Sequence, residues 1–211
     1  MKTDDLIDAL AVGLDPSRPA RLDATMIALA GLAAALALVL ILGVRPNPGD
    51  ILTTPSIWLK GLYTALLATG SLWLAFRLGR PGAGTKGPVI LLAAVVGVAV
   101  IWGVVELMMT PSGERMADWL GRTWTICGRN ILMLSAAAGA PTFLSARKLA
   151  PTRTMGAGLA LGLASGAIAA TAYGVLHCPE ATAAFVATWY SLGIVAAGAV
   201  GAVAGRYALR W

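Results

Sequence analysis

The stretch that decides the fold is PVILLAAVVGVAVIWGVVELMM, residues 88–109, in which Glu106 is the one charged side chain. An α-helix needs about 20 apolar residues to cross the roughly 30 Å hydrocarbon core of a bilayer, whereas runs of about 10–14 are more typical of helices inside soluble proteins. The stretch therefore predicts a membrane-spanning helix.

The rest of the 211-residue chain has the same character: 58% of residues are hydrophobic, 12% are charged and the mean hydropathy is +0.77. Soluble domains carry about 25% charged residues, so this composition excludes a soluble globular enzyme. Long apolar runs, rather than short alternating ones, favour helices over a membrane barrel. We predict an all-α integral membrane protein, a bundle of six transmembrane helices at residues 24–44, 56–78, 88–109, 126–146, 154–176 and 182–205.

The distribution of basic residues predicts how the chain is inserted, because cytoplasmic loops retain Lys and Arg. Eleven of the 16 basic residues lie before span one, between spans two and three, between spans four and five, or after span six. We therefore predict a bacterial inner (cytoplasmic) membrane protein with both termini in the cytoplasm. The basic residues are spread singly over loops, so the net charge of +6 is a topology signal and does not indicate nucleic-acid binding.

Residues 1–23 are predicted to form a cytoplasmic binding segment ahead of a transmembrane sensor domain at 24–211. Thr3 can cap a short helix over residues 3–14, with acidic side chains on one face and apolar side chains on the other. A helix this short is only marginally stable alone in water, so we expect it to bind in a groove of a partner. Its acidic face makes binding to an anionic lipid surface unfavourable. The partner is either a basic protein or the chain's own basic loops. The candidate partner-binding residues are Asp4, Asp5, Leu6, Ile7, Asp8, Leu10 and Leu14.

The only two cysteines, Cys127 and Cys178, are predicted to open span four and close span five on the non-cytoplasmic side. His177 and Glu180 flank Cys178, which makes four candidate sensing residues at one boundary. Three chemistries stay open: a disulfide, oxidation of the thiols, or a soft metal ion held transiently by Cys127, Cys178 and His177. Two inert buried thiols are the alternative. Because there is no CxxC motif to pass electrons onward, the pair indicates a sensor more than a catalyst.

Glu106 lies about one turn inside the outer end of span three, where we expect it to reach water or to pair with Arg129 or Lys60. Small residues recur at every fourth position of spans five and six, which predicts close packing of these two helices. They are Gly158, Gly162 and Gly166 in span five, and Gly193, Ala197, Gly201 and Gly205 in span six.

The chain has no P-loop, Rossmann glycine pattern, HExxH or Ser/His/Asp set, so we expect neither an enzyme nor a resident cofactor. Two rival classes remain. A small membrane transporter or channel would use Glu106 and the glycine-rich helices, and a membrane thiol-redox protein would use the cysteine pair.

Four short motifs together resemble one family: MKTDDLIDAL at residues 1–10, HCPE at 177–180, WY at 189–190 and LRW at 209–211. The chain resembles the negative regulator of sigma F (NrsF) family of six-span inner-membrane anti-sigma factors over essentially its whole length. The resemblance implies that the amino-terminal segment holds an extracytoplasmic-function sigma factor inactive at the membrane. It also implies that Cys127 and Cys178 are needed for the response to heavy-metal or oxidative stress.

Overall fold

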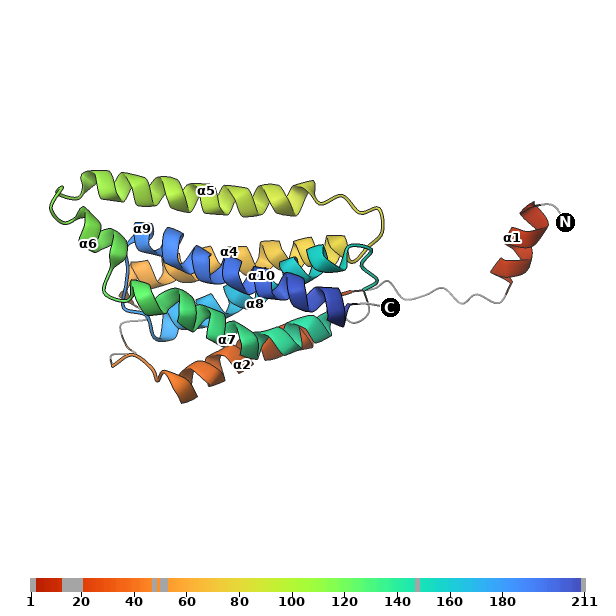
Figure 1. The fold of residues 1–211 in the computed structure, drawn as a ribbon, viewed down its shortest axis with the longest axis horizontal. Helices are drawn as coiled ribbons and strands as arrows, with labels where there is room; N and C mark the ends of the chain where they lie inside the picture. The colour runs from red at the N-terminus through yellow and green to blue at the C-terminus, as the bar shows by residue number, and fades with distance from the viewer. Residues whose placement is uncertain (1–2, 13–20, 47–48, 50–52, 147–148, 210–211) are drawn as a thin grey trace.

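The computed structural model describes residues 3–12, 21–46, 49, 53–146 and 149–209, and its regular secondary structure over these residues is helical (Figure 1). The long helices are α2 (Ala24–Ile41), α4 (Pro55–Leu78), α5 (Lys86–Met109), α7 (Trp124–Ser145), α8 (Thr154–Leu176) and α10 (Ser191–Ala208). The shorter elements are α1 (Thr3–Ala11), α6 (Arg115–Leu120), α9 (Ala183–Phe185) and the π-helical turn η1 (Val186–Tyr190), which continues into α10. The all-α prediction is confirmed for the described part of the chain.

Residues at the helix ends explain where the helices begin and turn. The carboxylate of Asp23 accepts a hydrogen bond from the N–H of Thr25 at 2.9 Å and caps α2. Pro55 occupies the first turn of α4, where its missing N–H costs nothing. Gly82 has a φ of 75°, which favours glycine, and it turns the chain between α4 and α5. The N–H of Asp23 also donates to the C=O of Ser145 at 3.2 Å, so the start of α2 is joined to the end of α7.

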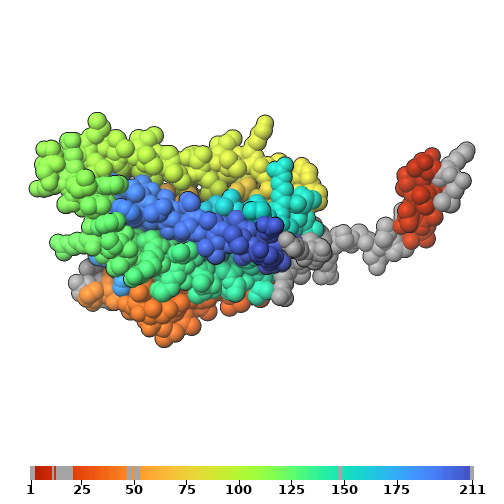
Figure 2. All heavy atoms as spheres, in the orientation of Figure 1, coloured from red at the N-terminus to blue at the C-terminus, as the bar shows by residue number. Residues whose placement is uncertain are grey.

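Helix α8 lies at the centre of the bundle, in contact with α2, α4, α7 and α10. Of its most apolar 18-residue window, 61% is buried, against 11% for α5. Helix α5 accordingly runs along one edge of the bundle, as Figures 1 and 2 show. The core of the protein is therefore built around α8, and α5 is the helix least enclosed by its neighbours.

Five helical stretches among the described residues are long and apolar enough to cross a membrane: Ala24–Ile41, Pro55–Leu78, Lys86–Met109, Thr154–Leu176 and Ala183–Ala208. Helix α7 has a similar length of 22 residues but is not one of the five. Arg129 and Asn130 near its start and Pro141 near its end lower its hydropathy. Length and composition thus support five of the six predicted spans.

Glu106 has a different partner from those expected. Its carboxylate accepts hydrogen bonds from the N–H groups of Ala183 at 2.6 Å and Ala184 at 3.2 Å, at the start of α9. A carboxylate suits this position because the first N–H groups of a helix lack partners within the helix. These bonds stand in place of the expected pairing with Arg129 or Lys60, while the partial exposure of Glu106 agrees with the other expectation, that it reaches water. The residue ties α5 to the helix that continues into α10.

Glycines bring α8 and α10 into backbone contact. A Cβ atom on Gly162 would lie 2.8 Å from the Cα of Gly201, and one on Gly158 would lie 2.7 Å from the Cα of Gly205. Neither position has room for a side chain, because the atoms that would be struck belong to the backbone of the facing helix. The predicted close packing of spans five and six is confirmed.

Replacing Gly162 with leucine should force α8 and α10 apart and lower the free energy of unfolding by about 1–3 kcal/mol, the usual cost of overpacking. Thermal unfolding of the detergent-solubilised protein would measure the loss. Gly97→Leu in α5 is the matched control, since no atom lies within 4 Å of a Cβ at that position. Equal stability of the two variants would contradict the packing described above.

Candidate functional site

The two cysteines lie at one end of the bundle, where α7 begins and α8 ends. Cys127 is in the first turn of α7, and its N–H donates to the C=O of Thr123 at 2.9 Å. Cys178 follows the last turn of α8, and its N–H donates to the C=O of Tyr173 at 2.9 Å. Both residues are completely buried, and both are free thiols. Antiparallel packing of α7 and α8 therefore brings together two sulfur atoms that are distant in sequence.

Aromatic side chains surround the thiol pair, which is part of the main hydrophobic core cluster. The ring centroid of Tyr190 lies 6.1 Å from that of Tyr173 and 6.3 Å from that of Phe185. All three rings are at most 1% exposed. The sulfur atoms thus lie in a dry environment closed by rings from α8, α9 and η1.

Two basic side chains from other parts of the bundle hold the turn at residues 177–180. The guanidinium of Arg45, which follows α2, donates to the C=O of Cys178 at 2.6 Å. The ammonium of Lys60 in α4 donates to the same carbonyl at 3.1 Å and also to the C=O of Glu180. Lys60 is only 3% exposed, and a buried charge is costly unless it is hydrogen-bonded. The carbonyl groups of the turn therefore stabilise Lys60, and Lys60 in turn fixes the turn to α4.

His177 and Glu180 make structural contacts on either side of the thiols. The Nδ1 atom of His177 lies 3.0 Å from the C=O of Gly43, and its ring packs on Tyr173 with centroids 5.4 Å apart. The carboxylate of Glu180 accepts a hydrogen bond from the N–H of Arg122 at 2.8 Å, just before α7. These contacts join the turn to the end of α2 and to the start of α7.

The arrangement brings the two thiols together but does not assemble the expected three-ligand metal site. Within the described ranges, no group of three or more His, Cys, Asp and Glu side chains is placed to hold a metal ion. Cys127 and Cys178 meet, while the imidazole of His177 is directed to a backbone carbonyl. The chemistry that the observed geometry offers is that of a dithiol.

Several neighbouring groups lower the pKa of the Cys178 thiol. The thiol of Cys127 lies within hydrogen-bonding reach and lowers the pKa of the Cys178 thiol. The hydroxyl of Tyr190, the ammonium of Lys60 and the backbone N–H of Glu180 lower this pKa further, while burial opposes them. A thiolate is the reactive form of cysteine, so these donors favour reaction at Cys178.

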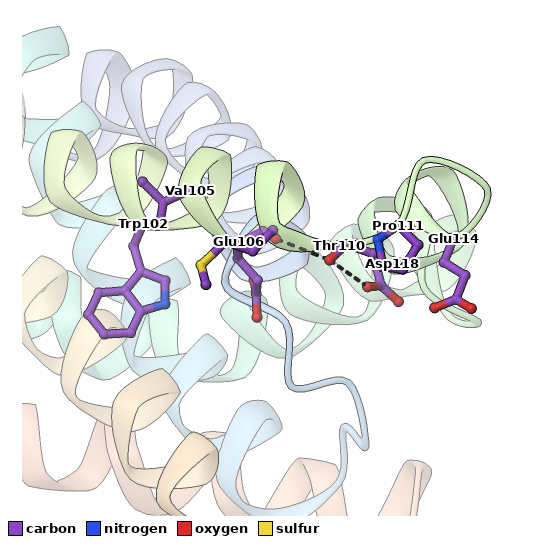
Figure 3. Close-up of a pocket in the computed structure, with 8 residues that line it drawn as sticks. Trp102, Val105, Glu106, Thr110, Pro111, Glu114 and Asp118 are labelled. Atoms are coloured by element: carbon purple, nitrogen blue, oxygen red, sulfur yellow. Dashed lines mark hydrogen bonds between the residues drawn. The ribbon is translucent and has the colours of Figure 1, made fainter.

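A separate open pocket of about 510 Å³ lies between α5 and α6 (Figure 3). It is lined by Trp102, Val105, Glu106, Met109, Thr110, Pro111, Glu114 and Asp118. Three of its polar side chains are engaged locally: Glu106 caps α9, and the hydroxyl of Thr110 donates to Asp118 at 3.3 Å. None of the residues predicted for sensing or partner binding lies in this pocket.

The amino-terminal helix α1 lies away from the bundle, beyond the end opposite the thiol pair (Figures 1 and 2). It is shorter than predicted and ends at Ala11. Six of the predicted binding residues are on it and all are exposed: Asp4, Asp5, Leu6, Ile7, Asp8 and Leu10. The seventh, Leu14, lies outside the described residues.

The residues that the sequence did not identify are Arg45, Lys60 and Tyr190. Arg45 and Lys60 act on the thiol turn through backbone carbonyl groups, which leave no pattern in a sequence. In the sequence, Tyr190 contributes only to the family resemblance, as part of the WY pair at 189–190. The sole local signal for Lys60 is its unusual position inside an apolar stretch.

Comparison with known proteins identifies one family. The sequence model described as negative regulator of sigma F matches residues 10–211. The anti-sigma-F factor NrsF of Caulobacter vibrioides (strain NA1000 / CB15N) is 41% identical to this chain, and the alignment covers 100% of both proteins. A probable anti-sigma-F factor NrsF of Azospira oryzae is 40% identical, again over 100% of both. No solved structure matches. The chain belongs to the negative regulator of sigma F family.

Proposed function

We propose that this protein is a membrane-embedded anti-sigma factor that holds an extracytoplasmic-function sigma factor through residues 1–23 and releases it when the thiol pair reacts. The observation that carries the proposal is the separation of two features: the exposed amphipathic helix α1 lies beyond one end of the bundle, and Cys127 and Cys178 lie at the other. The names of the two relatives supply the class of partner.

The exposed apolar surface supports a position in the bacterial inner membrane. Leu40 on α2, with Ile101 and Met108 on α5, are each at least two-thirds exposed. Large apolar side chains exposed on the outer helices are unfavourable in water and suit lipid. Helix α7, whose Asn130, Ser135 and Thr142 side chains are buried within the bundle, acts as the sixth span in this proposal. Basic residues concentrate at the end nearest α1, which supports a cytoplasmic location for both termini.

The surface of α1 suits a basic protein with an apolar groove. Leu6, Ile7 and Leu10 are all exposed, and an apolar helix face of this kind gains free energy when a partner covers it. Asp4 and Asp8 add negative charge on the flank, which complements a basic partner and opposes adsorption to anionic lipid. A sigma factor bound here is held at the membrane and kept from transcription.

The thiol pair supports the sensing half of the proposal because it lies where four segments meet. The turn that carries Cys178 contacts the end of α2, the buried Lys60 of α4 and the start of α7. A disulfide or a bound soft metal ion changes the energy of a site by several kcal/mol, and about 5.5 kcal/mol inverts a 1:99 population. Reaction at the sulfurs is therefore large enough in energy to repack this end of the bundle.

The binding half predicts that Leu10→Asp in the full-length protein weakens binding of the cognate sigma factor at least about tenfold, because a charge would enter the buried contact. Titration of the sigma factor against the protein in nanodiscs measures the affinity. Ala9→Asp, which adds the same charge outside the Leu6, Ile7 and Leu10 face, is the matched control and should bind nearly normally. Unaltered binding by Leu10→Asp would remove α1 from the interface.

The sensing half predicts that Cys127→Ser and Cys178→Ser each retain the sigma factor when cadmium ions or hydrogen peroxide are added, whereas the unmodified protein releases it. Release is read as loss of sigma factor from sedimented proteoliposomes. Met133→Leu, which removes a different sulfur from α7, should still release its partner. If both serine variants release the sigma factor as the unmodified protein does, the thiols are not the sensor.

A further inference from the structure

Tyr190 carries a buried hydroxyl group that completes no hydrogen bond with any described residue. The side chain is completely buried, between the rings of Tyr173 and Phe185. Its hydroxyl oxygen comes so close to α8 that a Cβ on Gly174 would lie 3.1 Å from it. Buried hydroxyl groups in proteins nearly always have a partner, so an unsatisfied one calls for a functional explanation.

The backbone at Tyr190 is also unusual. Residues 186–190 form the π-helical turn η1, between α9 and α10. Such turns interrupt the regular α-helical hydrogen bonds, are rare and occur frequently at functional sites. The turn ends on Tyr190 and sets the direction in which its ring enters the core. Local structure and the unsatisfied hydroxyl therefore single out the same residue.

Cys178 belongs to the same buried cluster as Tyr190, and it follows by four residues the Gly174 that the hydroxyl approaches. The hydroxyl lies close enough to lower the pKa of the thiol, although its geometry completes no hydrogen bond to the sulfur. The thiol of Cys127 and the N–H of Glu180 approach the same sulfur. Three hydrogen-bond donors therefore lie close to the sulfur of Cys178. One of them, the hydroxyl of Tyr190, has no acceptor among the described residues.

We propose that Cys178 is a modification site for peroxides and that the Tyr190 hydroxyl binds the oxygen atom that a peroxide adds to its sulfur. The inference rests on the proposed sensing function and names its first chemical step. An oxygen atom on the sulfur extends away from it and accepts a hydrogen bond from a hydroxyl donor, most strongly when the sulfenic acid is ionised to the sulfenate. Tyr190 is then a positioning residue, satisfied only after Cys178 has been oxidised.

The chemistry balances with a peroxide as the oxidant. The sulfur of Cys178 attacks one peroxide oxygen, so that an S–O bond forms and the O–O bond breaks. The thiol proton leaves with the released hydroxide as water, and Cys178 becomes a sulfenic acid. The thiol of Cys127 then attacks this sulfur: the S–S bond forms, the S–O bond breaks and a second water leaves. The dithiol loses two electrons and the peroxide gains two.

The surroundings of the two sulfur atoms indicate which cysteine reacts with the peroxide first. Cys127 lies within the helical backbone of α7, where its N–H is held by the C=O of Thr123. Cys178 lies in a non-helical turn, close to the Tyr190 hydroxyl and the N–H of Glu180. Both side chains are completely buried, which favours a reagent little larger than water over a bulky one. Cys178 therefore reacts first, and Cys127 closes the disulfide.

The test uses the full-length Cys127→Ser protein in nanodiscs, so that the sulfenic acid at Cys178 cannot proceed to a disulfide. Hydrogen peroxide is added with dimedone, which traps sulfenic acids, and mass spectrometry follows the labelled Cys178 peptide. Tyr190→Phe keeps the ring and removes the hydroxyl. It should lower the rate of labelling roughly tenfold, the effect of one hydrogen bond to a charged group.

Tyr63→Phe is the matched control, because the Tyr63 hydroxyl is also in the core but is already bonded to Ser191 at 2.6 Å. This variant should label at the normal rate. Equal rates for Tyr190→Phe and Tyr63→Phe would overturn the role of Tyr190, and faster labelling of Cys127 in a Cys178→Ser protein would overturn the assignment of Cys178. Because the label is read on the sulfur itself, normal labelling without release of the sigma factor would refute the proposed function and leave this inference standing.

Discussion

The hydrogen bonds from Lys60 to the carbonyl groups of the turn at residues 177–180 are the interaction on which the rest of the site depends. An ammonium group in a dry bundle needs acceptors, and the turn supplies them because its backbone has left the helix α8. Arg45 shares the carbonyl of Cys178, so two positive charges from different segments meet at one peptide group. Any reaction that moves the backbone of Cys178 therefore also disturbs the burial of these charges.

The same turn explains how a change at one end of the bundle can reach the other. Helix α8 begins at Thr154, at the end nearest α1, and its last residues lead directly into the turn. At Gly158, Gly162, Gly201 and Gly205, α8 touches α10 through backbone atoms, so no side chain lies between the helices at these positions to absorb a displacement. Glu106 ties α5 to the start of the α9–α10 segment. These contacts make the core a connected structure in which the thiol end is not mechanically isolated.

The helices were predictable because long apolar runs and their Pro, Gly and basic boundaries are local features of the sequence. The contact between Gly162 and Gly201 was predictable for the same reason, since the spacing of small residues encodes it. The acceptors of Lys60 and Glu106 were not, because both bind backbone groups that every residue carries. The π-helical turn that orients Tyr190 has no pattern of its own. His177 was expected beside the sulfurs from its position in the chain, but the end of α2 supplies a carbonyl that holds its ring.

The proposed function requires the thiol end of the bundle to face outward and the end nearest α1 to face the cytoplasm. Single cysteines placed at the two ends of a Cys127→Ser, Cys178→Ser protein test it directly, with Gly113→Cys in the α5–α6 connection and Gly84→Cys in the α4–α5 connection. A membrane-impermeant maleimide should label Gly113→Cys in intact cells with a permeabilised outer membrane, and Gly84→Cys only after lysis. Labelling of Gly84→Cys before lysis, or of Gly113→Cys only after it, would contradict the account.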